Sequence, residues 1–111
     1  MRFLFVCTGN VARSPAAEAL MRELLPGAHE SRSAGISQFC PRPVTGEDVG
    51  WADVVAVMEA DHRAFIAERW PEATSKLRLL DVEDHYHRDD PALRALLESR
   101  LWDLLAELRV V

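Results

Sequence analysis

A cysteine and an arginine separated by five residues follow an apolar run at residues 2–6 of the chain. Cys7 begins the stretch Cys-Thr-Gly-Asn-Val-Ala-Arg-Ser-Pro, and Arg13 stands near its other end. Gly9 and Asn10 tolerate left-handed backbone, so this loop can turn successive amide N–H groups inward as a nest for an anion. Ser14 is then expected to cap a helix that has Pro15 at its first position, and the free N–H groups and positive dipole end of this helix add to the same field.

The two side chains offer complementary chemistry toward a phosphoryl group. The field of the loop and helix should favour the thiolate of Cys7, which is the nucleophilic form of cysteine. The planar guanidinium of Arg13 can pair with two phosphoryl oxygens at once. Without the flanking strand, the Gly-Asn pair and the helix start, a buried cysteine and a solvated arginine would be the simpler interpretation. No Gly-Lys-Ser or Gly-Lys-Thr follows, so the loop is not of the nucleotide-binding type.

The surrounding pattern indicates one α/β domain over residues 1–111. Strands that alternate with helices are typical of parallel βαβ units, in which helices cover both faces of the sheet. Ligands of such sheets bind beyond the carboxyl ends of the strands, which is where the Cys7 loop lies. Strands are expected over residues 2–6, 30–34, 53–58 and 77–82, and helices over residues 14–25 and 61–69, with one further helical turn capped by Thr45.

The last helix has the clearest pattern. Asp90 is expected to cap it and Pro91 to occupy its first position, where no amide donor is needed. Its apolar residues recur at helical spacing, so we expect them to form one buried stripe. The stripe consists of Leu93, Leu96, Leu97, Leu101, Leu104, Leu105 and Leu108.

The composition of the chain limits the kinds of partner that it can bind and indicates the cellular compartment. The chain is 49% apolar and carries a formal net charge of −5, with a pI near 5.3, so it has no general attraction for nucleic acid or an anionic membrane surface. Any anion that it binds must be held locally. Cys7 and Cys40 make no disulfide framework, which favours a reducing compartment, and we expect a cytoplasmic protein.

Residues 7–15 resemble the signature loop of the low-molecular-weight protein tyrosine phosphatases. The resemblance covers nearly the whole chain, through Ser-Ala-Gly at residues 33–35, Glu59 after an apolar strand and an acidic turn at residues 81–90, and it is greatest for the short bacterial branch. It implies a three-layer sandwich around a four-stranded parallel sheet of order 2-1-3-4. It also implies hydrolysis of a phosphorylated protein or a small phosphate ester, with phosphotyrosine favoured, through a phosphocysteine and without metal or cofactor.

The same resemblance assigns individual roles. Ser14 would donate to the thiolate and ease its departure, and Asn10 would hold the shape of the loop. Asp84 would give a proton to the leaving group and later take one from water, with Asp81 as the next candidate. Tyr86 would pack against the substrate. The phosphoryl group would be bound by Thr8, Gly9, Asn10, Val11, Ala12 and Ser14.

The sequence also departs from the family pattern. His85 and His87 replace residues of the family's Pro-Tyr-Tyr turn, and beside carboxylates they resemble metal ligands, although surface histidines are the favoured interpretation. Ala12 stands where many members carry a second loop cysteine, which leaves Cys40 as a candidate to resolve an oxidised Cys7 or as a bystander. His62 is interpreted as a helix-surface residue.

Two other functions are compatible with the loop. Thioredoxin-coupled arsenate reductases share it, but they use a further cysteine pair downstream, and no cysteine follows Cys40. A non-catalytic module that binds phosphate or phosphopeptide would keep Arg13 and the amide nest. Such a module would need neither Cys7 nor Asp84, so their presence favours an enzyme.

Overall fold

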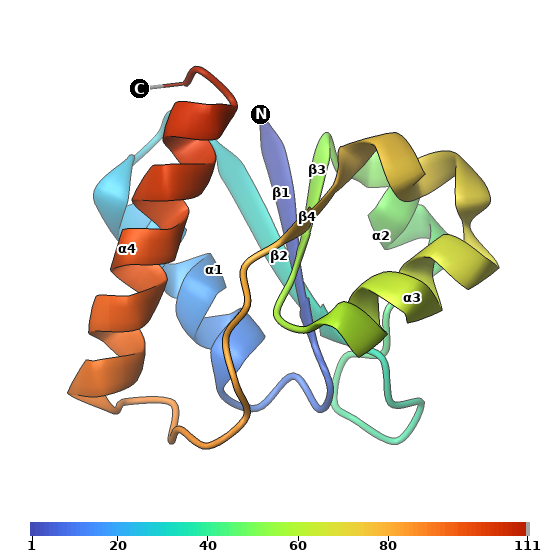
Figure 1. Cartoon of the computed structure of the whole chain (residues 1–111), viewed down its shortest axis with the longest axis horizontal. Helices are drawn as coiled ribbons and strands as arrows, with labels where there is room; N and C mark the ends of the chain where they lie inside the picture. Colours follow the sequence, from blue (N-terminus) through green and yellow to red (C-terminus); the bar gives the residue numbers. More distant parts are fainter. Residues whose placement is uncertain (111) are drawn as a thin grey trace.

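The computed structural model describes residues 1–110 and shows one sheet between two layers of helices (Figure 1). The four strands are parallel and lie in the order β2-β1-β3-β4. Helices α1 and α4 cover one face of the sheet, and α2 and α3 cover the other. The predicted three-layer fold and strand order are therefore confirmed. The elements are β1 (Arg2–Cys7), α1 (Arg13–Leu24), β2 (Glu30–Gly35), α2 (Gly46–Trp51), β3 (Val54–Val57), α3 (Ala60–Arg69), the 3-10 helix η1 (Pro71–Lys76), β4 (Leu77–Leu79) and α4 (Pro91–Glu107).

Strand β1 lies inside the sheet and is buried on both faces. Phe3 and Phe5 pack toward α1 and α4, whereas Leu4 and Val6 pack toward α2 and α3. All four side chains are fully buried, as a continuous apolar run in a parallel sheet requires. Cys7 ends this strand, so the chain leaves the sheet at the carboxyl edge, directly before the predicted loop.

Helix α4 buries the predicted leucine stripe against the sheet. Its start is also as expected, since the side chain of Asp90 accepts a hydrogen bond from the amide of Ala92 at 2.8 Å and Pro91 occupies the first turn. Leu96 and Leu108 lie at the edge of the stripe and are partly buried. The fully packed positions are Leu93, Leu97, Leu101, Leu104 and Leu105.

Helix α2 begins at a capping box, which confirms Thr45 as a cap. The Thr45 hydroxyl accepts from the amide of Asp48 at 3.2 Å, and the Asp48 carboxylate accepts from the amide of Thr45 at 3.3 Å. Two donors at the start of this short helix are thereby satisfied.

Strand β4 is shorter than predicted. It ends at Leu79 because Asp81 adopts a left-handed backbone, with φ of 58°, which an extended strand cannot contain. The chain nevertheless stays beside β3, since the amide of Val82 donates to the carbonyl of Met58 at 2.8 Å. This contact brings the segment after β4 to the same edge of the sheet as the end of β1.

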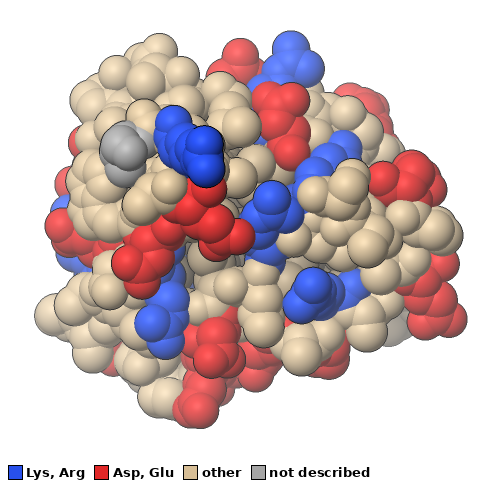
Figure 2. All heavy atoms as spheres, turned by 45° about the horizontal axis from the view of Figure 1, so that its top comes forward, with Lys and Arg blue, Asp and Glu red and all other residues tan. Residues whose placement is uncertain are grey.

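Acidic and basic side chains are interspersed over the face of the molecule that Figure 2 shows, rather than gathered by sign. Such a mixed surface gives little long-range attraction for either charge. Within residues 1–110, no helix combines the length and apolar character that crossing a membrane would need.

Candidate active site

The loop between β1 and α1 is held by hydrogen bonds within itself and by hydrogen bonds from the segment after β2. Asn10 adopts a left-handed backbone, with φ of 52°, and its side-chain amide donates to the hydroxyl of Ser14 at 3.0 Å. From the side of β2, the amides of Ile36 and Ser37 donate to the carbonyls of Cys7 and Thr8, both at 3.0 Å. The backbone at both ends of the loop is therefore fixed.

Ser14 lies inside α1 rather than at its cap. The helix begins one residue earlier, at Arg13, and its N-cap residue Ala12 makes no side-chain capping bond. The predicted capping role of Ser14 is therefore wrong. Its fully buried hydroxyl instead lies 2.9 Å from the Sγ of Cys7. Because Asn10 donates to this hydroxyl, the hydroxyl's own proton can point at the sulfur or at the more distant carbonyl oxygen of Ala34, at 3.4 Å. The shorter contact to sulfur suits a thiolate.

Arg13 is 2% exposed and is held by groups from distant parts of the chain. Its Nη1 donates to Glu59 at 2.9 Å and to the carbonyl of Val82 at 2.8 Å, and its Nη2 approaches the hydroxyl of Thr8 at 3.4 Å. One guanidinium nitrogen is thus committed to the protein, while the other faces the loop. A side chain fixed in this way is prepared for a planar, two-pronged contact with an oxyanion.

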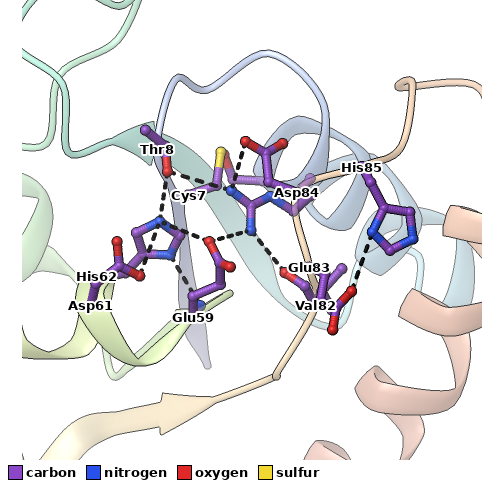
Figure 3. Close-up of polar contacts among 11 residues, drawn as sticks. Cys7, Thr8, Glu59, Asp61, His62, Val82, Glu83, Asp84 and His85 are labelled. Atoms are coloured by element: carbon purple, nitrogen blue, oxygen red, sulfur yellow. Dashed lines mark hydrogen bonds and ion pairs between the residues drawn. The ribbon is translucent and has the colours of Figure 1, made fainter.

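Asp84 lies beside the guanidinium of Arg13, and its side chain is 66% exposed. Its Oδ2 is 3.7 Å from the Nη2 of Arg13 (Figure 3). Asp81, the alternative candidate, makes no ion pair with Arg13 among the described residues. Of the two, Asp84 therefore has the position from which a carboxyl group could face a leaving group at the open side of the loop.

The two histidines near Asp84 are on the surface. His85 is paired with Glu83, with 3.3 Å between Nδ1 and Oε2, and its ring lies 4.2 Å from that of Tyr86. Tyr86 is half-buried and packs against the core beneath α4. His87 is exposed. Part of the Tyr86 side chain is thus engaged by the core, and the rest is exposed.

The first turn of α3 contributes two site residues that the sequence analysis did not identify, Glu59 and His62. His62 is fully buried, so its interpretation as a helix-surface residue is wrong. Its Nδ1 accepts from the amide of Glu59 at 3.0 Å, and its Nε2 lies 2.9 Å from the hydroxyl of Thr8. The signal was present in the sequence, since Glu59 comes two residues after the buried strand β3, whose carboxyl end shares an edge with that of β1.

Burial lowers the pKa of the His62 ring below its ordinary value of 6.5. The charge of Arg13 also lowers this pKa, whereas the carboxylates of Asp61, Glu59 and Asp84 raise it by smaller amounts than burial lowers it. The ring is therefore neutral at physiological pH. Glu59, Asp61 and His62 could together hold a cation by spacing alone, but the Glu59 carboxylate already accepts from Arg13 and both ring nitrogens are hydrogen-bonded.

The end of β2 packs closely against the loop at Gly35. A Cβ at this position would come within 2.7 Å of the carbonyl oxygen of Thr8, 3.1 Å of the amide nitrogen of Asn10 and 2.7 Å of the Sγ of Cys40. Only glycine fits between these atoms. Cys40 is thus a half-buried neighbour of the strand end.

Comparison with known proteins agrees with this geometry. The family model for low molecular weight phosphotyrosine protein phosphatases matches residues 2–41. The low molecular weight protein-tyrosine-phosphatase Etp of Escherichia coli is 30% identical over 119 residues, covering 80% of each chain. The chain therefore belongs to the low molecular weight protein tyrosine phosphatase family, as the loop predicted.

Relatives of this family differ in the substrates for which they are named. A protein-arginine-phosphatase of Geobacillus stearothermophilus is 35% identical over 98 residues, which is 68% of this chain and 66% of that protein. The tyrosine phosphatase Wzb of Escherichia coli K30, solved in complex with phosphate, superposes with a TM-score of 0.79 at 27% identity, covering 96% of this chain and 97% of that one. These relatives share a phosphatase fold, and their names specify two different phosphorylated residues, arginine and tyrosine.

Proposed function

We propose that this chain hydrolyses phosphate monoesters of proteins through a phosphocysteine on Cys7. We also propose that residues 1–111 form the one domain that carries out this reaction. The observation that carries the proposal is the convergence of Cys7, Ser14 and Arg13 at one loop. The thiol lies 2.9 Å from the hydroxyl of Ser14, and the guanidinium is buried at the other end of the loop. A nucleophile, a donor to it and an oxyanion clamp are the parts that phosphoryl transfer to sulfur requires.

In the first step, the thiolate of Cys7 attacks phosphorus and the bond from phosphorus to the leaving oxygen breaks. Asp84 gives its proton to that oxygen, so the leaving group departs as a neutral alcohol or phenol. The loop amides and Arg13 bind the three equatorial oxygens throughout. Glu59 and Val82 keep the guanidinium oriented while this occurs.

In the second step, water attacks phosphorus, Asp84 takes a proton from the water, and the bond from phosphorus to sulfur breaks. The departing electron pair returns to the sulfur of Cys7 as a thiolate. The hydroxyl of Ser14 is placed to donate to this sulfur, which makes it a better leaving group. Inorganic phosphate is released and the starting enzyme is restored.

For the substrate, we propose a phosphorylated protein whose modified side chain reaches the loop from the open side, with phosphotyrosine favoured. Val11 is 67% exposed and Tyr86 is half-buried, so the rim of the site offers apolar surface to an aromatic ring. Thr8, Gly9, Asn10, Val11 and Ala12 would present their amides to the phosphoryl oxygens.

The test is turnover of p-nitrophenyl phosphate in EDTA, with vanadate as inhibitor. We expect hydrolysis that survives the chelator, because amides, Arg13 and the helix dipole supply the positive charge. Peptides carrying phosphotyrosine and phosphoarginine, compared at equal concentration, then establish the preferred residue. Restoration of an EDTA-treated, inactive protein by zinc or manganese would instead make His85 and His87 metal ligands.

The same assay separates the other candidate functions. Phosphate binding without any turnover would indicate a binding module, and arsenate reduction in the presence of thioredoxin would indicate a reductase. The proposed hydrolase predicts turnover of the ester and no thioredoxin-dependent reduction, because no cysteine follows Cys40 to relay a disulfide.

A further inference from the structure

Thr8 and His62 form a hydrogen-bonded pair at the rim of the site, and no step of the proposed mechanism yet uses it. The Nε2 of His62 lies 2.9 Å from the hydroxyl oxygen of Thr8, although the residues are 54 apart in the chain. Figure 3 shows the ring of His62 between Glu59 and Thr8. Thr8 is exposed and directly follows Cys7, whereas His62 is fully buried.

The hydrogen bonds determine which ring nitrogen carries the proton. The amide N–H of Glu59 can only donate, and it points at the Nδ1 of His62 at 3.0 Å. Nδ1 must therefore be the unprotonated nitrogen, and in a neutral ring the proton is on Nε2. It follows that Nε2–H donates and that the oxygen of Thr8 accepts.

Both hydrogen-bond acceptor positions of the Thr8 hydroxyl oxygen are thereby occupied. A hydroxyl has one proton and two acceptor positions. His62 occupies one of these positions, and the Nη2 of Arg13, at 3.4 Å, is directed at the other. The proton of the hydroxyl is left to point away from both donors.

We propose that His62 is a positioning residue that holds the Thr8 hydroxyl as a fixed hydrogen-bond donor toward the bound phosphoryl group. The inference deepens the proposed function and rests on it. The hydroxyl stands next to the same guanidinium nitrogen that faces Asp84 at 3.7 Å, so the donor would be on the side of the site where the leaving group departs. The start of α3, with its N-cap residue, then holds both Arg13, through the Glu59 side chain, and Thr8, through His62.

Burial outweighs the carboxylates around the ring, which by themselves would favour its protonated form. Glu59 and Asp61 on α3 have carboxylate oxygens 3.8 Å and 4.0 Å from Nε2, Arg13 approaches from α1, and Asp84 faces it from the segment after β4. A second proton would place an N–H of the ring against the amide of Glu59, and that contact would break. Burial, which lowers the pKa of the ring, keeps this from occurring near neutral pH.

Two substitutions at one position separate this role from a purely structural one. In His62→Asn, the amide oxygen takes the place of Nδ1, so the bond from the Glu59 amide is kept and the donor to Thr8 is lost. In His62→Gln, the amide nitrogen reaches the place of Nε2, so the donor to Thr8 is restored. Thr8→Val removes the hydroxyl at nearly equal volume.

The experiment is titration of each variant with inorganic phosphate by calorimetry, with urea unfolding as a check of the fold. A hydroxyl donating to an oxyanion is a hydrogen bond to a charged group, so we expect Thr8→Val to weaken binding about 10-fold. We expect His62→Asn to weaken binding to a similar extent and His62→Gln to recover most of it. The double variant His62→Asn/Thr8→Val should bind no more weakly than Thr8→Val alone, because one residue acts through the other.

Nitrogen NMR of the ring in the unliganded wild type gives an independent readout, with the proton expected on Nε2. Additive losses in the double variant, unchanged binding in His62→Asn, or a proton on Nδ1 would each overturn the inference. If the wild type hydrolyses ester and binds phosphate while His62→Asn matches it, only this inference fails. If the wild type neither hydrolyses ester nor binds phosphate, the proposed function fails as well.

Discussion

The Oε2 of Glu59 lies 2.9 Å from the Nη1 of Arg13 and holds a guanidinium that is 2% exposed. Glu59→Ala should therefore leave a buried cation with one partner fewer. We expect a loss of about 1–3 kcal/mol in the free energy of unfolding, since the carbonyl of Val82 still accepts and Glu59 is itself partly solvated. Phosphate affinity should fall about 10-fold because the clamp is less well oriented. Urea unfolding and calorimetry measure the two effects.

Glu59→Gln is the matched control for this change. Its amide oxygen can still accept from Arg13, so the orientation of the guanidinium should be kept and phosphate affinity should stay close to that of the wild type. Equal losses in both variants would mean that the negative charge, rather than the acceptor, holds the clamp.

Removal of the nucleophile should separate catalysis from binding. Cys7→Ser is expected to abolish steady-state turnover, because the alcohol is not ionised at neutral pH, while Arg13 and the loop amides still bind phosphate. Calorimetry with phosphate should show an intact site, and Cys7→Ala should behave in the same way. A folded Cys7→Ser variant that binds no oxyanion would contradict the assignment of the loop.

Asp84→Asn should slow the hydrolysis of phosphate esters, and most strongly that of esters whose leaving group needs a proton in order to depart. We expect a loss of about 10²–10⁴-fold for phenyl or alkyl phosphates and a smaller loss for p-nitrophenyl phosphate, whose phenolate departs nearly unaided. Rapid-quench measurement of phosphoenzyme formation across graded aryl phosphates tests this. Asp81→Asn is the control, and a leaving-group dependence that arises only there would move the acid to Asp81.

The close contact at Gly35 predicts a packing defect with a functional readout. Gly35→Ala would place a methyl group 2.7 Å from the carbonyl oxygen of Thr8, so the loop must shift. We expect a destabilisation of about 1–3 kcal/mol and weaker phosphate binding. Gly50→Ala, in α2 and with nothing within 4 Å of the new atom, should instead be neutral or stabilising by up to about 1 kcal/mol. Wild-type phosphate affinity in Gly35→Ala would show that the loop adjusts freely.

The lowered pKa of His62 predicts a loss of stability in mild acid. The unfolded chain takes up a proton at this side chain near pH 6.5, whereas the folded chain does so only at lower pH. The contribution of neutral His62 to stability is therefore fully present above about pH 6.5. The free energy of unfolding falls as pH decreases from there toward the pKa of His62 in the folded chain. His62→Asn should lose less stability than the wild type between pH 7.5 and pH 5. His29, whose pKa is also lowered by burial, leaves part of the dependence in both proteins.

The strands, the last helix and the core of the loop were predictable because their signals are local. The apolar run of β1 ends at Cys7, and Gly9 and Asn10 follow it within three residues, so a candidate anion-binding loop and a candidate nucleophile are both predicted from one short segment. The stripe on α4 likewise needs only its own spacing. Each of these features is decided by residues that are neighbours in the chain.

The partners of Arg13 were not predictable in this way. Glu59 and Val82 are 46 and 69 residues away from it. The place of Glu59 after β3 indicates the edge of the sheet at which it lies, but no local pattern pairs either residue with a guanidinium. His62 was misplaced because its position in the first turn of α3 is compatible with a solvated face, and only the packing of that turn against the loop buries it. The end of β4 depends on one backbone angle at Asp81, which a generic apolar pattern does not encode.

The guanidinium of Arg13 also ties the formation of the site to the order in which the chain assembles. Its partners are Thr8 after β1, Glu59 after β3, and Val82 and Asp84 after β4, so its full set of contacts exists only once the last strand has docked. Contacts between residues so distant in sequence form late, because the closure of long loops must precede them. Full phosphate affinity would therefore return during refolding only when the segment after β4 docks, and a chain in which that segment has not docked would bind phosphate more weakly.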